Sequence, residues 1–256
     1  MNYYKYSSNS NDEFTINRSS ASRTPSPPPL PIKESNFYYI TVATKPHPVL
    51  TNLQKKVERM NETLIVLGES ENRSIGWDAR GNFGIKLREF SNFINKPELC
   101  NDDIVLFTDA FDVAYFGNKT EIVKRFREFE NPIVFGCEKY CFPDPQNCDK
   151  YTDRDGREFP YLNSGMFIGY VWAFRLCISN YVYNDADDDQ RFWTHMFFEK
   201  PELIELDYDN RLFLNMNDID MNEFSYLVNT VFYQDRNPLF IHDNGPDKAL
   251  ISKFLT

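Results

Sequence analysis

The chain has 256 residues, of which 41% are hydrophobic and 16% aromatic, enough for a sizeable core and too many for a mainly disordered protein. Acidic residues outnumber basic ones by 38 to 28, giving a formal net charge of −10. This charge argues against general nucleic-acid binding, so we expect no nucleic-acid partner. A phosphate-containing ligand would need local cations or a metal ion beside it.

The first 35 residues are polar and then rich in proline. Such a stretch buries too little apolar surface to offset the entropy of ordering it, so we predict a disordered tail over 1–35. No apolar stretch reaches the roughly 20 residues of a membrane-spanning helix, and the N-terminus lacks the apolar core of a secretory signal. We expect a soluble protein without a membrane span.

From residue 36 onward, strand-like apolar runs alternate with segments of helical spacing. The strand-like runs are 37–43, 62–68, 102–107 and 132–137, and the helical segments between them are 47–60, 84–95 and 118–130. This alternation predicts a Rossmann-like α/β fold with a mostly parallel, doubly wound sheet.

The pattern becomes less regular after residue 137. A polar segment precedes the apolar run 162–170, helices are predicted over 171–182 and 185–200, and late strands over 211–216, 224–232 and 238–242. No repeat and no second linker is visible. We therefore predict one domain over 36–256, with an irregular C-terminal half.

The segment FTDAFDV places Asp109 and Asp112 directly after a predicted strand. Ligands of open parallel sheets bind beyond the carboxyl ends of the strands, and two carboxylates three residues apart can both reach a hard cation. A turn in which both accept backbone hydrogen bonds is the alternative, and spacing alone does not decide between them. His242 also follows a predicted strand; alone it suits a hydrogen-bonded surface histidine, but with the two aspartates it becomes a third ligand. The set fits Mg²⁺ or Mn²⁺, and the imidazole favours Mn²⁺.

A run of aspartates, DADDD over 185–189, opens the segment 185–200, which is predicted to be an acidic cap that continues into a helix. The free N–H groups and the dipole of a helix N-terminus stabilise one or two such carboxylates. Four of them within five positions repel one another unless a cation or a basic ligand relieves the repulsion. Both a capping role and a functional role are therefore open.

Five positions carry weaker signals. Trp77, in a glycine-flanked segment, is suited to pack on a base or a sugar, although a loop tryptophan also commonly anchors its own loop. Lys86 opens a predicted helix, where it can meet a phosphate or remain solvated. Glu138 and Asn163 lie where the sheet should open to a cleft. Gly245, in an Asn-Gly-Pro turn, lets the backbone approach a ligand closely.

Together these motifs resemble the glycosyltransferase domain of procollagen lysyl hydroxylases and the related collagen galactosyl- and glucosyltransferases. The matching segments, in the order and roughly at the spacing of that family, are ITVAT (40–44), FTDAFDV (107–113), CEKYCFPDP (137–145), LNSGMFIGY (162–170), DADDDQRF (185–192) and HDNGPDK (242–248). The chain ends where a lysyl hydroxylase would continue, so we expect a stand-alone transferase. Its Asn-, Tyr-, Phe- and Asp-rich composition suits an AT-rich genome, and we expect a giant-virus source.

The resemblance implies a GT-A fold, bound Mn²⁺ and a UDP-sugar donor, and it assigns the metal to Asp109, Asp112 and His242. The positions that it assigns to the donor are Val42, Ala43 and Thr44 at the uridine, Trp77 and Lys86 nearby, Asp109, Ala110 and Phe111 at the nucleotide, and Asn244, Gly245, Pro246, Asp247 and Lys248 around the diphosphate. The positions that it assigns to sugar transfer and the acceptor side are Glu138, Asn163, Asp187, Asp188 and Asp189. Three positions depart from the family pattern, namely Phe142 in place of Trp, Ala186 within the acidic run and Asp247 in place of a small polar residue.

The expected reaction is glucosyl transfer from UDP-glucose to galactosylhydroxylysine of collagen-like polypeptides, with galactosyl transfer to hydroxylysine as the alternative. A haloacid-type phosphohydrolase would place its second aspartate two residues after the first, whereas the interval here is three. An inactive UDP-sugar or collagen-binding module is disfavoured by the intact ligand set. A homodimer is left open, and so is the compartment, with the cytoplasm of an infected host cell or the virion as alternatives.

Overall fold

The structure is a computed structural model that describes residues 35–76, 81–227 and 229–254. All of the predicted tail except Ser35 therefore lies outside the described residues, and so does Trp77. Among the described residues, no helix has the length and apolar character needed to cross a membrane.

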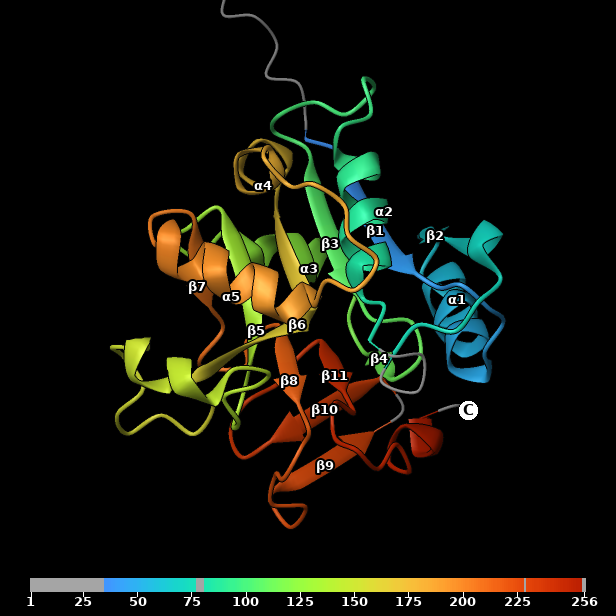
Figure 1. Ribbon diagram of the computed structural model, residues 1–256. Coiled ribbons are helices and arrows are strands. Elements are labelled where there is room, and N and C mark those ends of the chain that lie inside the picture. Colours follow the sequence, from blue (N-terminus) through green and yellow to red (C-terminus); the bar gives the residue numbers. More distant parts are fainter. Residues whose placement is uncertain (1–34, 77–80, 228, 255–256) are drawn as a thin grey trace, which may run out of the picture. The chain divides into compact units, whose positions relative to one another are not determined.

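A central sheet of six strands, in the order β2–β1–β3–β6–β5–β7, forms the frame of the fold (Figure 1). Its strands are β1 (Phe37–Val42), β2 (Leu64–Leu67), β3 (Ile104–Thr108), β5 (Ile133–Glu138), β6 (Tyr161–Tyr170) and β7 (Ile204–Leu206). Only β6 runs against the others, because it pairs antiparallel with both β3 and β5. The prediction of a mostly parallel sheet is confirmed, but β6 separates the strands β3 and β5.

Helices cover both faces of this sheet. They are α1 (Pro48–Arg59), α2 (Gly84–Ile94), α3 (Lys119–Phe126), α4 (Val171–Ile178) and α5 (Asp189–Glu199), with short 3-10 turns at η1 (Glu69–Glu71), η3 (Pro145–Lys150) and η4 (Ile251–Phe254). One core joins α2, α4 and α5 to one face of the sheet, and a second core joins α1 and α3 to the other (Figure 1). On the first face, the ring of Phe90 packs edge-to-face on Phe107, Phe167 and Trp193. Burying a side chain of this size stabilises the fold by about 1.5–3 kcal/mol.

Short strands complete the C-terminal half. One three-stranded sheet has the order β4 (Val113–Tyr115), β11 (Phe240–His242) and β8 (Phe213–Asn215), and β9 (Phe224–Leu227) pairs antiparallel with β10 (Thr230–Tyr233). The apolar run 224–232, expected as one strand, is thus two. Alternation of apolar residues does not distinguish one strand from two that pair back on each other. The strands β4 and β7 were not predicted, because three residues show no clear periodicity.

The register of the three-stranded sheet determines which polar residues meet. His242, at the end of β11, lies opposite Val113 of β4 and opposite Asn215 of β8. Asp112 directly precedes Val113, so this pairing brings the histidine to the aspartate at the edge of β4. The sheet therefore assembles residues that are more than a hundred positions apart in the sequence.

Candidate active site

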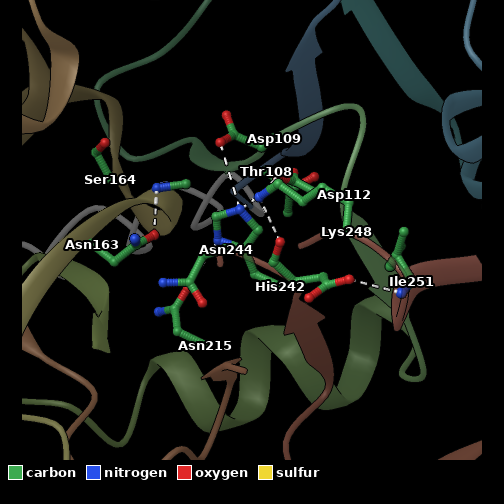
Figure 2. A network of polar contacts seen from close by, with 12 residues as sticks. Thr108, Asp109, Asp112, Asn163, Ser164, Asn215, His242, Asn244, Lys248 and Ile251 are labelled. Carbon is green, nitrogen blue, oxygen red and sulfur yellow. Dashed lines mark hydrogen bonds and ion pairs between the residues drawn. The ribbon is translucent and has the colours of Figure 1, made fainter. Parts of the chain in front are cut away.

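Asp109, Asp112 and His242 point toward one another at the ends of β3, β4 and β11 (Figure 2). The imidazole Nε2 of His242 lies 3.3 Å from Asp112 Oδ1 and 3.7 Å from Asp109 Oδ2. Potential ligand atoms of the three residues all lie within 4.8 Å of one another, close enough to hold one metal ion. The predicted trio therefore meets in space.

The orientation of His242 supports a cation at this position. Its Nδ1 lies 2.8 Å from Asn215 Oδ1, and Asn215 Nδ2 donates to the carbonyl of Cys137 at 2.8 Å. Because the amide nitrogen is committed to Cys137, Asn215 presents its oxygen to His242 and the imidazole donates from Nδ1. The lone pair of Nε2 then faces two carboxylates. A partner that fixes the second ring nitrogen in this way is typical of a metal-bound histidine, so the residues fit a divalent cation.

Gly165 of β6 makes room for the histidine ring. A Cβ atom at this position would lie 2.2 Å from His242 Cε1 and 2.7 Å from Nδ1. The Gly165 carbonyl also accepts a hydrogen bond from the Asp109 backbone N–H at 2.7 Å. Its role was not predicted. The only signal in the sequence was a glycine within the strand-like run 162–170, which commonly marks a close backbone approach.

Two lysines flank the trio and supply the local positive charge that an acidic protein needs beside a phosphate. Lys86 Nζ lies 2.6 Å from Asp109 Oδ1 and 3.3 Å from Asp189 Oδ2, and Lys248 Nζ lies 2.7 Å from Asp112 Oδ2. Burial alone would lower the pKa of Lys86, yet the two adjacent carboxylates raise it above its usual value. Burial likewise opposes ionisation of Asp112, but His242, when it is protonated, and Lys248 hold the pKa of its carboxyl well below the usual range. The solvated lysine considered for position 86 is wrong, because this side chain is largely buried.

A cavity of about 910 Å³ lies beside these residues. The predicted site residues that line it are Val42, Lys86, Asp109, Ala110, Phe111, Asp112, Glu138, Asn163, Asp188, Asp189, His242, Asn244, Gly245, Pro246 and Lys248. The residues predicted to bind the metal, to bind the donor and to act in sugar transfer therefore line the same cavity.

Among the described residues, four of the predicted site residues do not line this cavity. Ala43 packs in a small apolar cluster, and the Thr44 hydroxyl donates to the carbonyl of Arg73. Asp247 accepts from the N–H of Ala249 at 3.0 Å, which stabilises a local turn. Asp187 lies in the turn before α5, where its N–H donates to the Asn184 carbonyl.

The members of the acidic run have different partners, which relieves the repulsion expected from the sequence. Asp185 pairs with Arg73, with Oδ2 and Nη1 2.9 Å apart. Asp188 caps α5 by accepting from the N–H of Arg191 at 2.9 Å, so the capping interpretation holds for this residue. Asp189 faces the cavity, where Ser164 donates to it at 2.9 Å and Lys86 balances its charge.

Glu138, at the end of β5, is held by three side-chain amides. Its Oε1 accepts from Asn163 Nδ2 at 2.9 Å and from Gln190 Nε2 at 2.8 Å, and its Oε2 accepts from Asn244 Nδ2 at 3.0 Å. Burial raises the pKa of Glu138, and the three donors oppose this rise. Gln190 and Ser164 lie in the matching segments 185–192 and 162–170 but were not predicted as site residues, because a neutral glutamine or serine alone indicates no particular chemistry.

The fold and the cavity wall together define the class. The chain has a mostly parallel α/β sheet with two aspartates and a histidine at strand ends, and Lys86 of α2 and Lys248 of the loop after β11 join them in lining a large cavity. Together with the family match and the solved structure reported next, this arrangement defines a glycosyltransferase with the GT-A fold. The chain belongs to the family of PLOD GT domains, whose family model matches residues 33–255. The resemblance identified from the motifs is thereby confirmed.

Known relatives extend well beyond this domain. The chain is 32% identical over 232 residues to procollagen-lysine,2-oxoglutarate 5-dioxygenase 1 of Gallus gallus, covering 86% of this chain and 31% of the relative. It is 30% identical over 235 residues to multifunctional procollagen lysine hydroxylase and glycosyltransferase LH3 of Homo sapiens, covering 87% and 31%. The chain thus spans under a third of these proteins.

A solved structure supports the fold. The crystal structure of a glycosyltransferase involved in the glycosylation of the major capsid of PBCV-1 is similar to this chain with a TM-score of 0.50 at 10% identity. The match covers 86% of this chain and 98% of that one. At this identity the likeness concerns the fold alone.

Proposed function

We propose that this glycosyltransferase transfers glucose from UDP-glucose to galactosylhydroxylysine of collagen-like polypeptides with Mn²⁺ as its metal. The observation that carries the proposal is that Asp109, Asp112 and His242 line one cavity together with two lysines. These lysines, Lys86 and Lys248, contact the two aspartates of the trio. The collagen-related acceptor is supported by the relative whose name states lysine hydroxylation of procollagen together with glycosyl transfer.

The donor end of the cavity suits a nucleoside diphosphate. Asp109, Asp112 and His242 would hold the metal, which when bound supplies Lewis-acid stabilisation of charge on the leaving diphosphate. Lys248 lies in the loop after β11, beside Gly245, where its ammonium can approach a phosphate oxygen. Lys86 holds Asp109 and Asp189 in fixed positions, so it links the metal ligands to the sugar side of the cavity.

Another group of lining residues, which includes Glu138 and Asp189, suits a hexose and a cationic acceptor. Glu138 and Asn163 form a buried pair that can accept hydrogen bonds from sugar hydroxyls and donate hydrogen bonds to them. Asp188 and Asp189 add carboxylates at the start of α5. The ε-amine of hydroxylysine remains protonated when its hydroxyl is glycosylated, so these carboxylates would attract the acceptor as well as orient it.

The test is release of UDP from UDP-glucose and from UDP-galactose, each with Mn²⁺ or with EDTA, and with or without a galactosylhydroxylysine peptide. We expect turnover of UDP-glucose that needs both the metal and the peptide. Turnover of UDP-galactose on bare hydroxylysine peptide would instead favour the galactosyltransferase alternative, and donor binding without any turnover would favour an inactive binding module.

The metal assignment is tested by Asp112→Ala, which should abolish metal-dependent transfer. The matched control is Asp155→Ala, because Asp155 lies in an exposed turn that does not line the cavity. Unchanged turnover in Asp112→Ala would refute the assignment.

A further inference from the structure

The outer rim of the cavity is formed by two exposed aromatic residues, Tyr140 and Phe142. Their side chains are 39% and 56% exposed, and both line the cavity. The ring centroids lie 6.1 Å apart with a tilt of 44°. Exposed aromatic rings that line a cavity offer flat apolar faces on which the C–H face of a hexose can pack. We call these two residues the aromatic rim.

The side chain of Gln190 connects the aromatic rim to Glu138, another residue that lines the cavity. Gln190 Nε2 donates to the Phe142 carbonyl at 2.9 Å and to Glu138 Oε1 at 2.8 Å. Its Oε1 accepts from the Ser164 N–H at 3.3 Å. Gln190 therefore joins three segments, namely the rim, the end of β5 and the middle of β6. It lies in the first turn of α5, which is anchored in the core by the buried Trp193.

The chemistry of this position requires a neutral amide. The two hydrogens on Nε2 serve two acceptors at once and Oε1 accepts from one donor, so both donor sites of the side chain are used. Alanine would remove both donors from the Phe142 carbonyl and Glu138. Glutamate would replace the donor to Glu138 with a second carboxylate at hydrogen-bond distance, where two like charges repel. Asparagine would be one methylene too short to reach the rim from the same helix position.

We propose that Gln190 is a positioning residue for the acceptor, because it holds the aromatic rim at a fixed place relative to Glu138 and the sugar side of the cavity. The proposal rests on the proposed function for the identity of the acceptor. It predicts that Gln190 affects acceptor use much more than donor binding, since the donor-side residues Lys248 and His242 have no hydrogen bond to it in the described part of the chain.

The experiment compares Gln190→Ala with Gln54→Ala, a change of a helical glutamine in α1 that does not line the cavity. In Gln190→Ala, which leaves the Phe142 carbonyl and Glu138 without the Gln190 donors, we expect acceptor-dependent transfer to fall about tenfold, mainly through a higher KM for the galactosylhydroxylysine peptide. Binding of UDP-glucose with Mn²⁺, measured by calorimetry, should change less than twofold. Hydrogen exchange of backbone amides 139–144 should become faster without ligand, while exchange in α5 stays unchanged.

A second variant separates positioning from a general loss of structure. In Gln190→Glu, acidification protonates one carboxyl of the new pair, which can then donate to the other. Transfer should therefore rise on the acid side of the pH profile relative to the wild-type enzyme. Gln54→Ala should match the wild type in every measurement.

Three results would overturn the proposal. Unchanged hydrogen exchange over 139–144 in Gln190→Ala would show that Gln190 does not hold the rim, whether or not any acceptor is turned over. Equal losses of donor affinity and transfer would indicate a general structural role. If the pH profile of Gln190→Glu is parallel to that of the wild type, the contact between Gln190 and Glu138 is not the cause of the effect on transfer. Absence of transfer in the wild-type enzyme would count against the proposed function, and hydrogen exchange would still decide the role of Gln190.

Discussion

Gly165 of β6 gives the most direct test of the geometry of the proposed metal site. In Gly165→Ala the new Cβ would lie 2.2 Å from His242 Cε1, more than 1 Å inside normal contact. The imidazole would have to move away, and its bond to Asn215, 2.8 Å long, would stretch or break. Overpacking of this kind costs about 1–3 kcal/mol. Loss of the partner that orients a metal-bound histidine lowers metal affinity about 10–100-fold.

Denaturant unfolding and Mn²⁺ calorimetry of Gly165→Ala measure these two effects. A penalty of about 2 kcal/mol corresponds to a fall in Tm of roughly 4–8 °C for a domain of this size. The matched control is the same change in a His242→Ala background, where the ring is absent. There, Gly165→Ala should cost little, because the two substitutions are coupled through one contact. The reasoning fails if the penalty is the same in both backgrounds, or if Gly165→Ala binds Mn²⁺ as the wild type does.

Further predictions concern the surroundings of the same site and one lysine far from it. Asn215→Leu should weaken Mn²⁺ binding about 10–100-fold by calorimetry. Asn215→Asp keeps an acceptor for His242, so its loss of Mn²⁺ affinity should be much smaller. Equal losses of affinity in the two variants would contradict the orienting role of Asn215. Lys86→Met leaves buried carboxylates without their cation and should lower the free energy of unfolding of the metal-free protein by about 3–5 kcal/mol in denaturant titrations; a loss below 1 kcal/mol would contradict this. Burial lowers the pKa of Lys56, which lies 4.0 Å from the Phe116 ring centroid, from 10.5 to about 8. The unfolded chain therefore binds more protons between these values, so the wild type should gain stability relative to Lys56→Met as the pH rises from about 8 to 10.5; a difference independent of pH would refute the shift.

Local sequence pattern was sufficient for the parts of the site that lie at strand ends. Within the predicted strand 102–107, residues 104–107 are all apolar, which predicts a strand covered on both faces, and Asp109 and Asp112 follow shortly after it. The chain direction and the strand period then place both carboxylates at the ligand-binding edge. His242 follows the last predicted strand in the same way, and the structure brings all three together.

The roles of the individual aspartates in the acidic run 185–189 could not be predicted from local sequence pattern. Sequence alone indicated that one or two of its aspartates cap a helix, but successive helical residues differ in direction by about 100°, so their roles depend on where the helix begins. The structure starts α5 at Asp189 and makes Asp188 the cap. Asp185 then pairs with Arg73, a partner 112 positions away that no local rule connects with it.

By itself, the sequence determined the alternation of strands and helices, the mostly parallel sheet and the strand ends that carry the trio, because these depend on periodicity and chain direction over a few residues. Tertiary structure alone decided that β6 enters antiparallel between β3 and β5, that Asn215 orients His242, and that Gly165 makes room for its ring. The same holds for Gln190 and its bonds to three segments. These features depend on pairing and close packing between residues distant in the chain, which hydrophobic periodicity does not encode.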